Sequence, residues 1–520
     1  MNGNSGGNRG PRRAGALAVL AAVAVLVAAC GGSSPSSSTG SASRGSPTFR
    51  ANLAYAHCMQ THGLPNFPDP NPSESFSVSG QLNGNANSPA ARANTSCEHL
   101  LPRAPTTAPA TPSPPGAIDC LTASQCYAPR QFRVAYGIQP LLDRGITGRG
   151  VTVVLPEEAE TGPARPQPVT NILQSVTDIR QDLADFDSRF GLPAAKIQAI
   201  TTLAGSSASP WLASVEEVED TELVHAVAPD ATIRELLVDP ADVRTPAKLA
   251  AAFDKWVRLA VSNGEVISQS GMGQEFNVGE SSWTSVEVAT MNSALQYAAA
   301  RAVTVVVASG DDGAIGNGSS SPVKEVSLPA SDPLALAAGG TSLTANPATG
   351  AYQSETAWNT PSGPAPSASG GGFSHLFARP TYQDGVPGIG ATRGVPDVAG
   401  DASSGTGGMA LAFSAPSGGY EFIGAGGTSA AAPFWAGLIA LADQEAGHAL
   451  GLVNPAIYRI ARSPLYHKAF HDITTGNNTV ALNGTTITGY QAGPGWDPVT
   501  GWGTPDAQVL IPLLARYTSS

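Results

Sequence analysis

The sequence is poor in charged residues, and those it has are mostly acidic. Charged residues make up 13% of the 520 residues, against about 25% in average soluble proteins. There are 28 Lys and Arg against 40 Asp and Glu, a formal net charge of −12 at pH 7. A nucleic-acid partner needs a basic face, so we expect none. Few carboxylates also means a smaller charge change on acidification, so the composition permits work in acid.

The chain also lacks an apolar run long enough to suggest a membrane span. Its longest runs from about Ala14 to Ala29 behind three arginines, whereas a span needs ~20 residues. This pattern is typical of a signal peptide, which we predict for residues 1–29. The end of the run, VAAC, resembles a bacterial lipobox, which implies cleavage before Cys30 and a lipid on its sulfur. The alternative is ordinary secretion with Cys30 discarded or free.

Cysteine is scarce, and no Cys-x-x-Cys spacing suggests a zinc site. Without Cys30, four cysteines remain. An even number in an exported chain predicts two disulfides, for which three pairings are possible. We expect Cys58–Cys97 and Cys120–Cys126, because each pair lies within one compositional block.

Composition divides the chain into segments. Residues 30–49 are rich in Gly and Ser and predict a flexible tether. Residues 50–103 form a small Cys-containing block, which a disulfide would stabilise because so short a segment buries little core. Residues 104–117 form a Pro-rich linker, and residues 118–520 form one large domain.

In the large domain, apolar strand-like runs alternate with helical patterns. This alternation predicts an α/β fold, a parallel sheet with helices on both faces, and a functional site at the carboxyl ends of the strands. The predicted strands are VTVVL (151–155), ATIRELLV (231–238), EVISQS (265–270) and VTVVVASG (303–310), and the predicted helices cover about 176–191, 213–229, 248–264 and 285–302.

The tetrapeptide Gly-Gly-Thr-Ser occurs twice, ending at Ser342 and Ser429. Ser342 is followed by turn-forming residues, which indicate a tight turn after a strand. Ser429 is followed by helix formers up to Gly447, with Pro433 early in that helix, where its missing N–H matters least. A serine near a helix start lies beside unpaired N–H groups that favour developing negative charge. Ser429 is therefore the candidate nucleophile.

A nucleophilic serine needs a base, and the usual histidine setting is missing. None of the eight histidines stands in a His-Gly-Thr-His context, and the first strand, VTVVLPEE, offers no Asp at its end for a subtilisin-like triad. His225, on a predicted helix, is an alternative base for a neutral hydrolase.

A pair of carboxylates on that helix is the other candidate. Glu216 and Asp220 are spaced i, i+4 and share one face. Their mutual repulsion predicts a shared proton and a raised pKa, so the pair could accept a serine proton in acid, where histidine is charged. The alternative is that these acids form a solvated helix face. A third acid, Asp311, follows a predicted strand in SGDDG, although Asp-Gly also occurs in ordinary loops.

Together these motifs resemble the sedolisin family of serine-carboxyl peptidases with a subtilisin-like fold, over roughly residues 119–517. The resemblance rests on GGTSAAAPFWAG, EEVEDTELVHAVAPDATI and SGDDG in this order. It implies that Ser429 is the nucleophile, that Glu216 is the general base and acid, and that Asp220 orients Glu216. It also implies that protonated Asp311 donates to the oxyanion, so the site would work at low pH.

Two C-terminal segments, FHDITTG and GYQAGPGWDPVTGWG, resemble the calcium site of that family. The resemblance implies one structural Ca²⁺, which prefers hard oxygen ligands. Asp472 and Asp497 would supply carboxylates, and Ile473, Gly493 and Gly495 would supply backbone carbonyls.

The sequence therefore predicts an exported acid endopeptidase that cleaves proteins or peptides, is held at the membrane through a lipidated Cys30, and is a monomer. The competing function is an inactive surface lipoprotein that binds peptides or wall material. The chain departs from the family in three respects. Family members usually carry a large propeptide, so here either the small block replaces it or folding is unassisted. Glu219 precedes Asp220 where an apolar residue is usual, and Gly271 stands where many members have an aromatic ring.

Overall fold

The computed structural model describes an N-terminal part and most of the large domain. The segments 1–29 and 104–117, and with them Cys30 and Cys120, lie outside the described residues. No helix among the described residues is both long and apolar enough to cross a membrane. The described residues are 47–62, 64–65, 97 and 126–517, with gaps at 161–163, 165, 167–174, 202–210, 240–241, 243–244, 263, 272–277, 319–322, 361–366, 406, 417 and 483.

The described residues form two separate units. The smaller contains helix α1 (Pro47–Thr61), which begins within the segment expected to be tether. Its buried side chains are Tyr55, Ala56, Met59 and Cys97. The predicted disulfide Cys58–Cys97 is present here, and so small a core needs such a covalent constraint.

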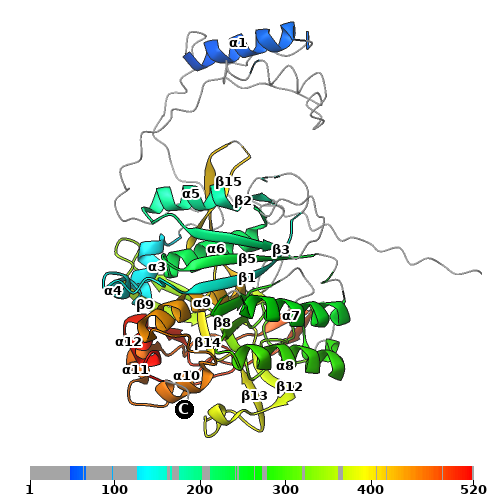
Figure 1. Cartoon of the computed structure of the whole chain (residues 1–520), viewed down its shortest axis with the longest axis vertical. Coiled ribbons are helices and arrows are strands. Elements are labelled where there is room, and N and C mark those ends of the chain that lie inside the picture. Colours follow the sequence, from blue (N-terminus) through cyan, green and yellow to red (C-terminus); the bar gives the residue numbers. More distant parts are fainter. Residues whose placement is uncertain are drawn as a thin grey trace, which may run out of the picture. The chain divides into compact units, whose positions relative to one another are not determined.

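The larger unit is built on one sheet in the order β14-β8-β7-β6-β1-β5-β3 (Figure 1). All pairings along this order are parallel, and β9 adds to β8 in antiparallel orientation. The strands are β1 (Thr152–Glu158), β3 (Lys196–Thr201), β5 (Thr232–Val238), β6 (Val266–Gln269), β7 (Thr304–Ala308), β8 (Leu336–Ala345), β9 (Tyr352–Ala357) and β14 (Val398–Asp401).

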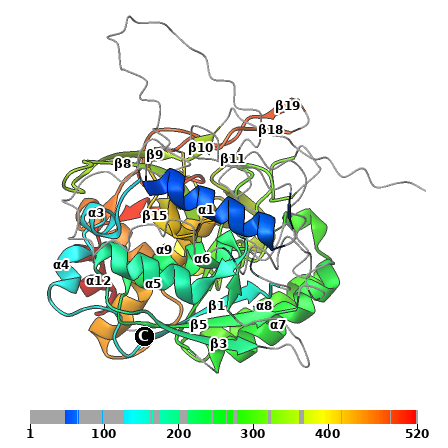
Figure 2. The same cartoon turned by 90° about the horizontal axis from the view of Figure 1, so that it is seen from above.

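Both faces of this sheet are buried, and alternate residues of a strand enter different cores. In β1, Val153 and Leu155 join one apolar cluster, whereas Val154 joins the other. The first cluster includes α5 (Ile179–Phe190), α6 (Val215–Val227) and α9 (Gly427–Ala446), and the second includes α7 (Pro246–Val261) and α8 (Ser285–Ala299). Figure 2 shows α5 and α6 on one side of β1 and β5, and α7 on the other. The predicted α/β fold with helices on both faces is confirmed.

Helix α6 begins and ends where its sequence requires. Ser214 is the N-cap, and Glu217 reaches back to accept the Ser214 N–H, which completes a capping box. The helix ends at Val227, two residues before Pro229, because proline disfavours helical backbone in the residue that precedes it.

Helix α9 ends at Gly447, which has a left-handed φ of 75°. It begins at Gly427, so Ser429 is its third residue and Pro433 its seventh. Pro433 therefore lies beyond the first turn, and our expectation that its missing N–H would matter little was wrong. Ser342 was also misplaced, because it lies inside β8 and not in a turn. Sequence analysis missed the edge strand β3 altogether.

The other elements lie around this core. They are α3 (Pro129–Ala135), α4 (Gln139–Leu142), β2 (Thr177–Asp178), β4 (Leu212–Ala213), β10 (Asn359–Thr360), β11 (Ser367–Ala368), β12 (Gly372–Ala378), β13 (Thr392–Val395), β15 (Ala410–Ser414), β16 (Tyr420–Gly424), α10 (Asn454–Ala461), α11 (Tyr466–Ala469), β17 (Phe470–His471), β18 (Val480–Leu482), β19 (Thr485–Ile487), β20 (Thr504–Pro505) and α12 (Ala507–Leu514), with short 3₁₀ turns η4 (Glu280–Ser282) and η5 (Thr381–Gln383).

Candidate active site

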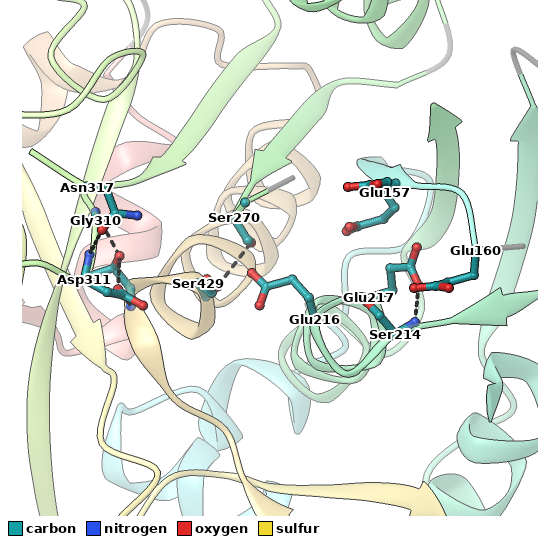
Figure 3. Close-up of a pocket in the computed structure, with 13 residues that line it drawn as sticks. Glu157, Glu160, Ser214, Glu216, Glu217, Ser270, Gly310, Asp311, Asn317 and Ser429 are labelled. Carbon is teal, nitrogen blue, oxygen red and sulfur yellow. Dashed lines mark hydrogen bonds between the residues drawn. The ribbon is translucent and has the colours of Figure 1, made fainter. Parts of the chain in front are cut away.

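A polar cleft of about 410 Å³ lies at the carboxyl ends of β1, β6 and β7, beside the start of α9 (Figure 3). This is where a parallel sheet collects functional residues. The cleft brings together Ser429, Glu216 and Asp311, three of the four residues predicted for catalysis. Its lining residues are Glu157, Glu158, Glu160, Ser214, Glu216, Glu217, Ser270, Gly271, Gly310, Asp311, Asn317, Thr428 and Ser429.

Ser429 and Glu216 face each other across the cleft. The Ser429 hydroxyl lies beside the carboxyl group of Glu216, in the first turn of α6, and acts on it as a hydrogen-bonding neighbour that lowers its pKa. Burial raises the pKa of Glu216 to about 7, although the bond from Ser429 opposes this shift. The carboxyl also approaches β6, since a Cβ on Gly271 would lie 3.6 Å from Oε1 of Glu216. The serine thus has a carboxyl group as its hydrogen-bond partner.

Asp220, the fourth predicted residue, lies behind this pair and is 1% exposed. The Ser270 hydroxyl lies 2.7 Å from both carboxylate oxygens of Asp220. Glu157 is also hydrogen-bonded to Asp220. Burial first, and then the nearby charge of Glu216, raise the pKa of Asp220 well above its ordinary value. Asp220 therefore acts on Glu216 through charge, while its hydrogen bonds run to Ser270 and Glu157.

Asp311 lies on the opposite side of Ser429, after β7. Its Oδ1 accepts the backbone N–H of Thr428 at 2.7 Å and the Thr428 hydroxyl at 2.8 Å. Its backbone N–H donates to Oδ1 of Asn317 at 3.1 Å. Burial raises the pKa of Asp311, and the two bonds from Thr428 oppose that shift. Because Oδ1 already accepts two hydrogen bonds, a proton on this carboxyl belongs on Oδ2.

Sequence reasoning assigned no role to three polar residues around this cleft. Glu157 is the last residue but one of β1, near the position where we looked for an Asp, and its longer side chain reaches Asp220. Ser270 follows β6 and carried no motif that could have identified it. Glu219 is 6% exposed and accepts the backbone N–H of Gly426, the N-cap of α9, at 3.0 Å. Glu219, which stands where the family usually has an apolar residue, thus holds the N-terminal end of α9, the helix that carries Ser429.

Two alternatives from the sequence do not fit this arrangement. The acids of α6 are not a solvated face, since Glu217, Glu219, Asp220 and Glu222 are buried. His225 is fully buried, and its Nε2 lies 2.8 Å from Oδ1 of Asp187 on α5. No histidine is among the described residues that line the cleft.

The residues predicted to hold calcium also come together. Asp472 accepts the backbone N–H of Gly495 at 3.0 and 3.1 Å, and Asp497 accepts that of Gly493 at 3.3 Å. The Tyr466 hydroxyl donates to Oδ1 of Asp472 at 3.0 Å, and burial, together with the charges of both carboxyls, raises the pKa of Tyr466. Burial raises the pKa of Asp497 to about 6. Two carboxylates beside a glycine-rich turn form a hard oxygen donor set that suits Ca²⁺.

Comparison with known proteins agrees with this fold. The profile of the subtilase family matches residues 201–503, more than half of the chain, so the chain belongs to the subtilase family. Among solved structures, Pseudomonas sedolisin, a serine-carboxyl proteinase complexed with pseudo-iodotyrostatin, matches with a TM-score of 0.59 and 28% identity. That match covers 74% of this chain and 97% of the sedolisin chain.

Curated relatives show which members of this family the chain is similar to. Kumamolisin from Bacillus sp. is 39% identical over 58% of this chain and 51% of its own length. Sedolisin from Pseudomonas sp. is 36% identical over 43% and 36%, and tripeptidyl-peptidase 1 from Bos taurus is 34% identical over 45% and 41%. The chain thus spans about half or less of the curated relatives it matches. Among the subtilases, the matched part of the chain is thus similar to kumamolisin and sedolisin.

Proposed function

We propose that this chain is an acid endopeptidase of the serine-carboxyl type. The observation that carries the proposal is the approach of the Ser429 hydroxyl to the Glu216 carboxyl, in a cleft that also holds Asp311. When Glu216 is ionised it can take the hydroxyl proton, and the carboxyl pair of Glu216 and Asp220 would keep one negative charge between them as the pH falls. The substrates would be proteins or peptides.

In this mechanism, the Ser429 oxygen attacks the carbonyl carbon of the scissile peptide bond while Glu216 takes the hydroxyl proton. The carbonyl C–O π electrons move to oxygen, which gives a tetrahedral oxyanion. Glu216 then returns the proton to the departing amine as the C–N bond breaks and an acyl-enzyme remains. A water molecule then attacks the acyl carbon while Glu216 takes a proton from it. Glu216 returns this proton to the Ser429 oxygen as the ester bond breaks, and the carboxylic acid product is released.

The oxyanion would be stabilised from the Asp311 side of the cleft. With Oδ1 holding both donors of Thr428, the proton on Oδ2 can be donated to the oxyanion. The positive dipole end of α9 also lies on this side of the cleft. Asp311 must therefore be neutral, so activity would fall as the pH rises through its pKa.

Asp220 and Glu216 would share their protons unequally. Burial raises the pKa of both carboxyls, and the charge of Glu216 adds to the shift of Asp220. Because Glu216 is the carboxyl that faces Ser429, it would be the base, with the shared proton held on Asp220.

A pH profile of peptidase activity on a denatured protein tests the proposal. Glu216→Gln keeps the size and hydrogen bonding of the side chain but cannot take a proton, so it should lose activity as completely as Ser429→Ala. Glu421→Gln is the matched control, since Glu421 lies on β16 and is not among the cleft-lining residues. Full activity in Ser429→Ala would refute the mechanism. A parent protein that binds peptides and cleaves none at any acid pH would favour the inactive lipoprotein.

We also propose that Asp472 and Asp497, with the backbone carbonyls of Ile473, Gly493 and Gly495, hold one structural Ca²⁺. When bound, the ion would neutralise the two carboxylates and brace the C-terminal loops around them. The close approach of both carboxyls to Tyr466 supports this assignment.

Export and lipid anchoring through Cys30 complete the proposal. They rest on the sequence alone, because Cys30 lies outside the described residues. Metabolic labelling with a fatty-acid analogue in a bacterial host should mark the parent protein and leave Cys30→Ala unmarked. An unlabelled parent protein recovered from the medium would instead indicate ordinary secretion.

A further inference from the structure

Asn317 lines the catalytic cleft, although the mechanism above gives it no contact with the substrate. It is partly exposed and follows Asp311 by six residues in the same loop. Figure 3 shows it on the same side of Ser429 as Asp311, with its side-chain nitrogen directed toward the cleft. This nitrogen is therefore a polar group that a substrate can reach.

Neighbouring residues hold Asn317 in one orientation. Its backbone N–H donates to the Ser327 hydroxyl at 3.0 Å, and its backbone carbonyl accepts the Gly279 N–H at 3.3 Å. Its Oδ1 accepts the backbone N–H of Asp311 at 3.1 Å. Because an N–H group needs an acceptor, the side-chain atom that faces the Asp311 backbone must be the amide oxygen. The amide nitrogen consequently points away from that backbone.

The two N–H bonds of this nitrogen have no acceptor among the residues that the structure describes, whereas the other polar groups of Asn317 are occupied. A peptide substrate presents a carbonyl acceptor at every residue. A donor held in a fixed direction needs no reorganisation when negative charge develops on such an oxygen. An amide also donates at every pH, whereas Asp311 donates only when protonated. Asn317 is therefore suited to bind a carbonyl oxygen in this cleft.

We infer that Asn317 is a substrate-binding residue whose side-chain nitrogen donates to a carbonyl oxygen of the peptide on the Asp311 side of the cleft. This oxygen is either the oxyanion, which would then receive donors from both Asp311 and Asn317, or the carbonyl oxygen of the peptide unit next to the scissile bond. The inference rests on the proposed peptidase activity, because the same cleft carries Ser429 and Glu216.

Steady-state kinetics of the full-length protein on quenched fluorescent peptides test it across the acid pH range. Asn317→Ala removes the two N–H donors together with Oδ1. Asn317→Asp keeps an oxygen that can accept the Asp311 N–H but has no donor once it is ionised. Asn346→Asp is the matched control, because Oδ1 of Asn346 also accepts backbone N–H groups, from Ala348 at 2.9 Å and Thr349 at 3.0 Å. Asn346 is not among the described residues that line the cleft.

The two possible oxygens predict different kinetics for Asn317→Ala. A donor to the oxyanion acts in the transition state, so kcat should fall by about 10²–10³-fold with little change in KM. A donor to the neighbouring carbonyl acts already in the bound substrate, so KM should rise about tenfold with kcat nearly unchanged. In the second case, a peptide in which CH₂ replaces that carbonyl should be handled alike by the parent and Asn317→Ala.

Asn317→Asp separates substrate binding from support of Asp311. If the donor matters, Asn317→Asp should lose activity at a lower pH than the parent, as its new carboxyl ionises. If Asn317 only holds the Asp311 backbone, the new negative charge should raise the pKa of Asp311 and extend activity to higher pH. Asn346→Asp should keep the parent profile.

Extended activity of Asn317→Asp, or parent kinetics in Asn317→Ala, would overturn the inference while the peptidase proposal stands. If Asn317→Ala does not fold, the profile of Asn317→Asp decides alone. If the parent protein cleaves no peptide and no denatured protein, both proposals fail.

Discussion

Pro433 lies four residues after Ser429 in α9, so the carbonyl of Ser429 has no backbone N–H to accept from the next turn. The Ser270 hydroxyl lies 3.2 Å from that carbonyl oxygen and 2.7 Å from both oxygens of Asp220. A hydroxyl donates one hydrogen and accepts others. Protonated Asp220 can therefore donate to Ser270, which in turn donates to the Ser429 carbonyl. Because Pro433 has no N–H, the Ser429 carbonyl is left to accept from Ser270. Ser270 thereby connects the backbone of Ser429 to Asp220.

Ser270→Ala should therefore lower kcat with little change in KM. It leaves the Ser429 carbonyl without a donor and the protonated Asp220 carboxyl without an acceptor, and losing one partner of a buried pair costs about 1–3 kcal/mol. Ser270→Thr keeps the hydroxyl and should restore most of the activity. Steady-state kinetics and thermal unfolding of both variants check this. A Ser270→Ala protein with lowered Tm and unchanged kcat would reduce Ser270 to a packing role.

Asp311→Asn should remove or displace the alkaline limb of the pH–activity profile. An amide donates a hydrogen bond at every pH, whereas Asp311 donates only when protonated, which burial favours by raising its pKa. Asp311→Ala removes the donor and should lower kcat by about 10²–10³-fold. Profiles of kcat for the parent and both variants make the comparison. An alkaline limb that stays in place in Asp311→Asn would show that another group controls it.

Gly427→Ala should impair activity more than stability. Gly427 has φ 75°, and a Cβ there would lie 2.7 Å from Oδ2 of Asp311. Gly447 also has φ 75°, but nothing lies within 4 Å of its Cβ position. Each alanine should cost about 1 kcal/mol of backbone strain, so Tm should fall alike in both. Only Gly427→Ala should lower kcat, measured on the same peptide. Equal activity of the two variants would mean that Asp311 moves aside without consequence.

The protein should be more stable in acid than at neutral pH. Burial raises the pKa of Glu217, Glu219, Asp220 and Glu222 well above ordinary values in the folded state. The stabilisation from these protonated groups is fully present below the unfolded pKa of about 4 and is lost as the pH rises through the folded pKa values. Each pH unit in that window removes about 1.4 kcal/mol per group.

Glu222→Gln isolates one of these groups. Oε2 of Glu222 accepts the backbone N–H of Ala412 at 2.8 Å, and a glutamine oxygen can accept the same bond without titrating. Its Tm should match the parent near pH 4, below the raised pKa, and exceed it near pH 8. Denaturant unfolding across this range measures the difference. An identical pH dependence in parent and variant would mean that Glu222 does not titrate as its burial requires.

Chelation of calcium should destabilise the large unit. If one Ca²⁺ binds the folded state, ion at a hundred times its Kd adds about 2.7 kcal/mol of stability. EDTA should lower Tm, added Ca²⁺ should restore it, and Asp497→Asn should abolish the response. Mg²⁺ serves as control, since it binds reluctantly to sites built from protein oxygens alone. A Tm that ignores EDTA and Ca²⁺ would reject the site.

The sequence by itself determined the local elements. Glu217 caps α6 and Gly447 ends α9, because caps depend on the nearest residues of the chain. The alternation of apolar runs also predicted the parallel sheet, since a buried strand needs apolar side chains on both faces. Motif order singled out Ser429 and Glu216, which the fold brings into one cleft although more than two hundred residues separate them.

Only the tertiary structure decided which acids share a buried environment. A run of carboxylates on a helix has the same pattern whether solvent or protein covers it. Packing of α6 against the sheet and against α9 made Glu219 and Asp220 interior groups. Glu157 and Ser270 had no local signal, because their partner Asp220 lies on another element. Burial raises a pKa through contacts made by residues far apart in the chain. No short stretch of sequence contains that information.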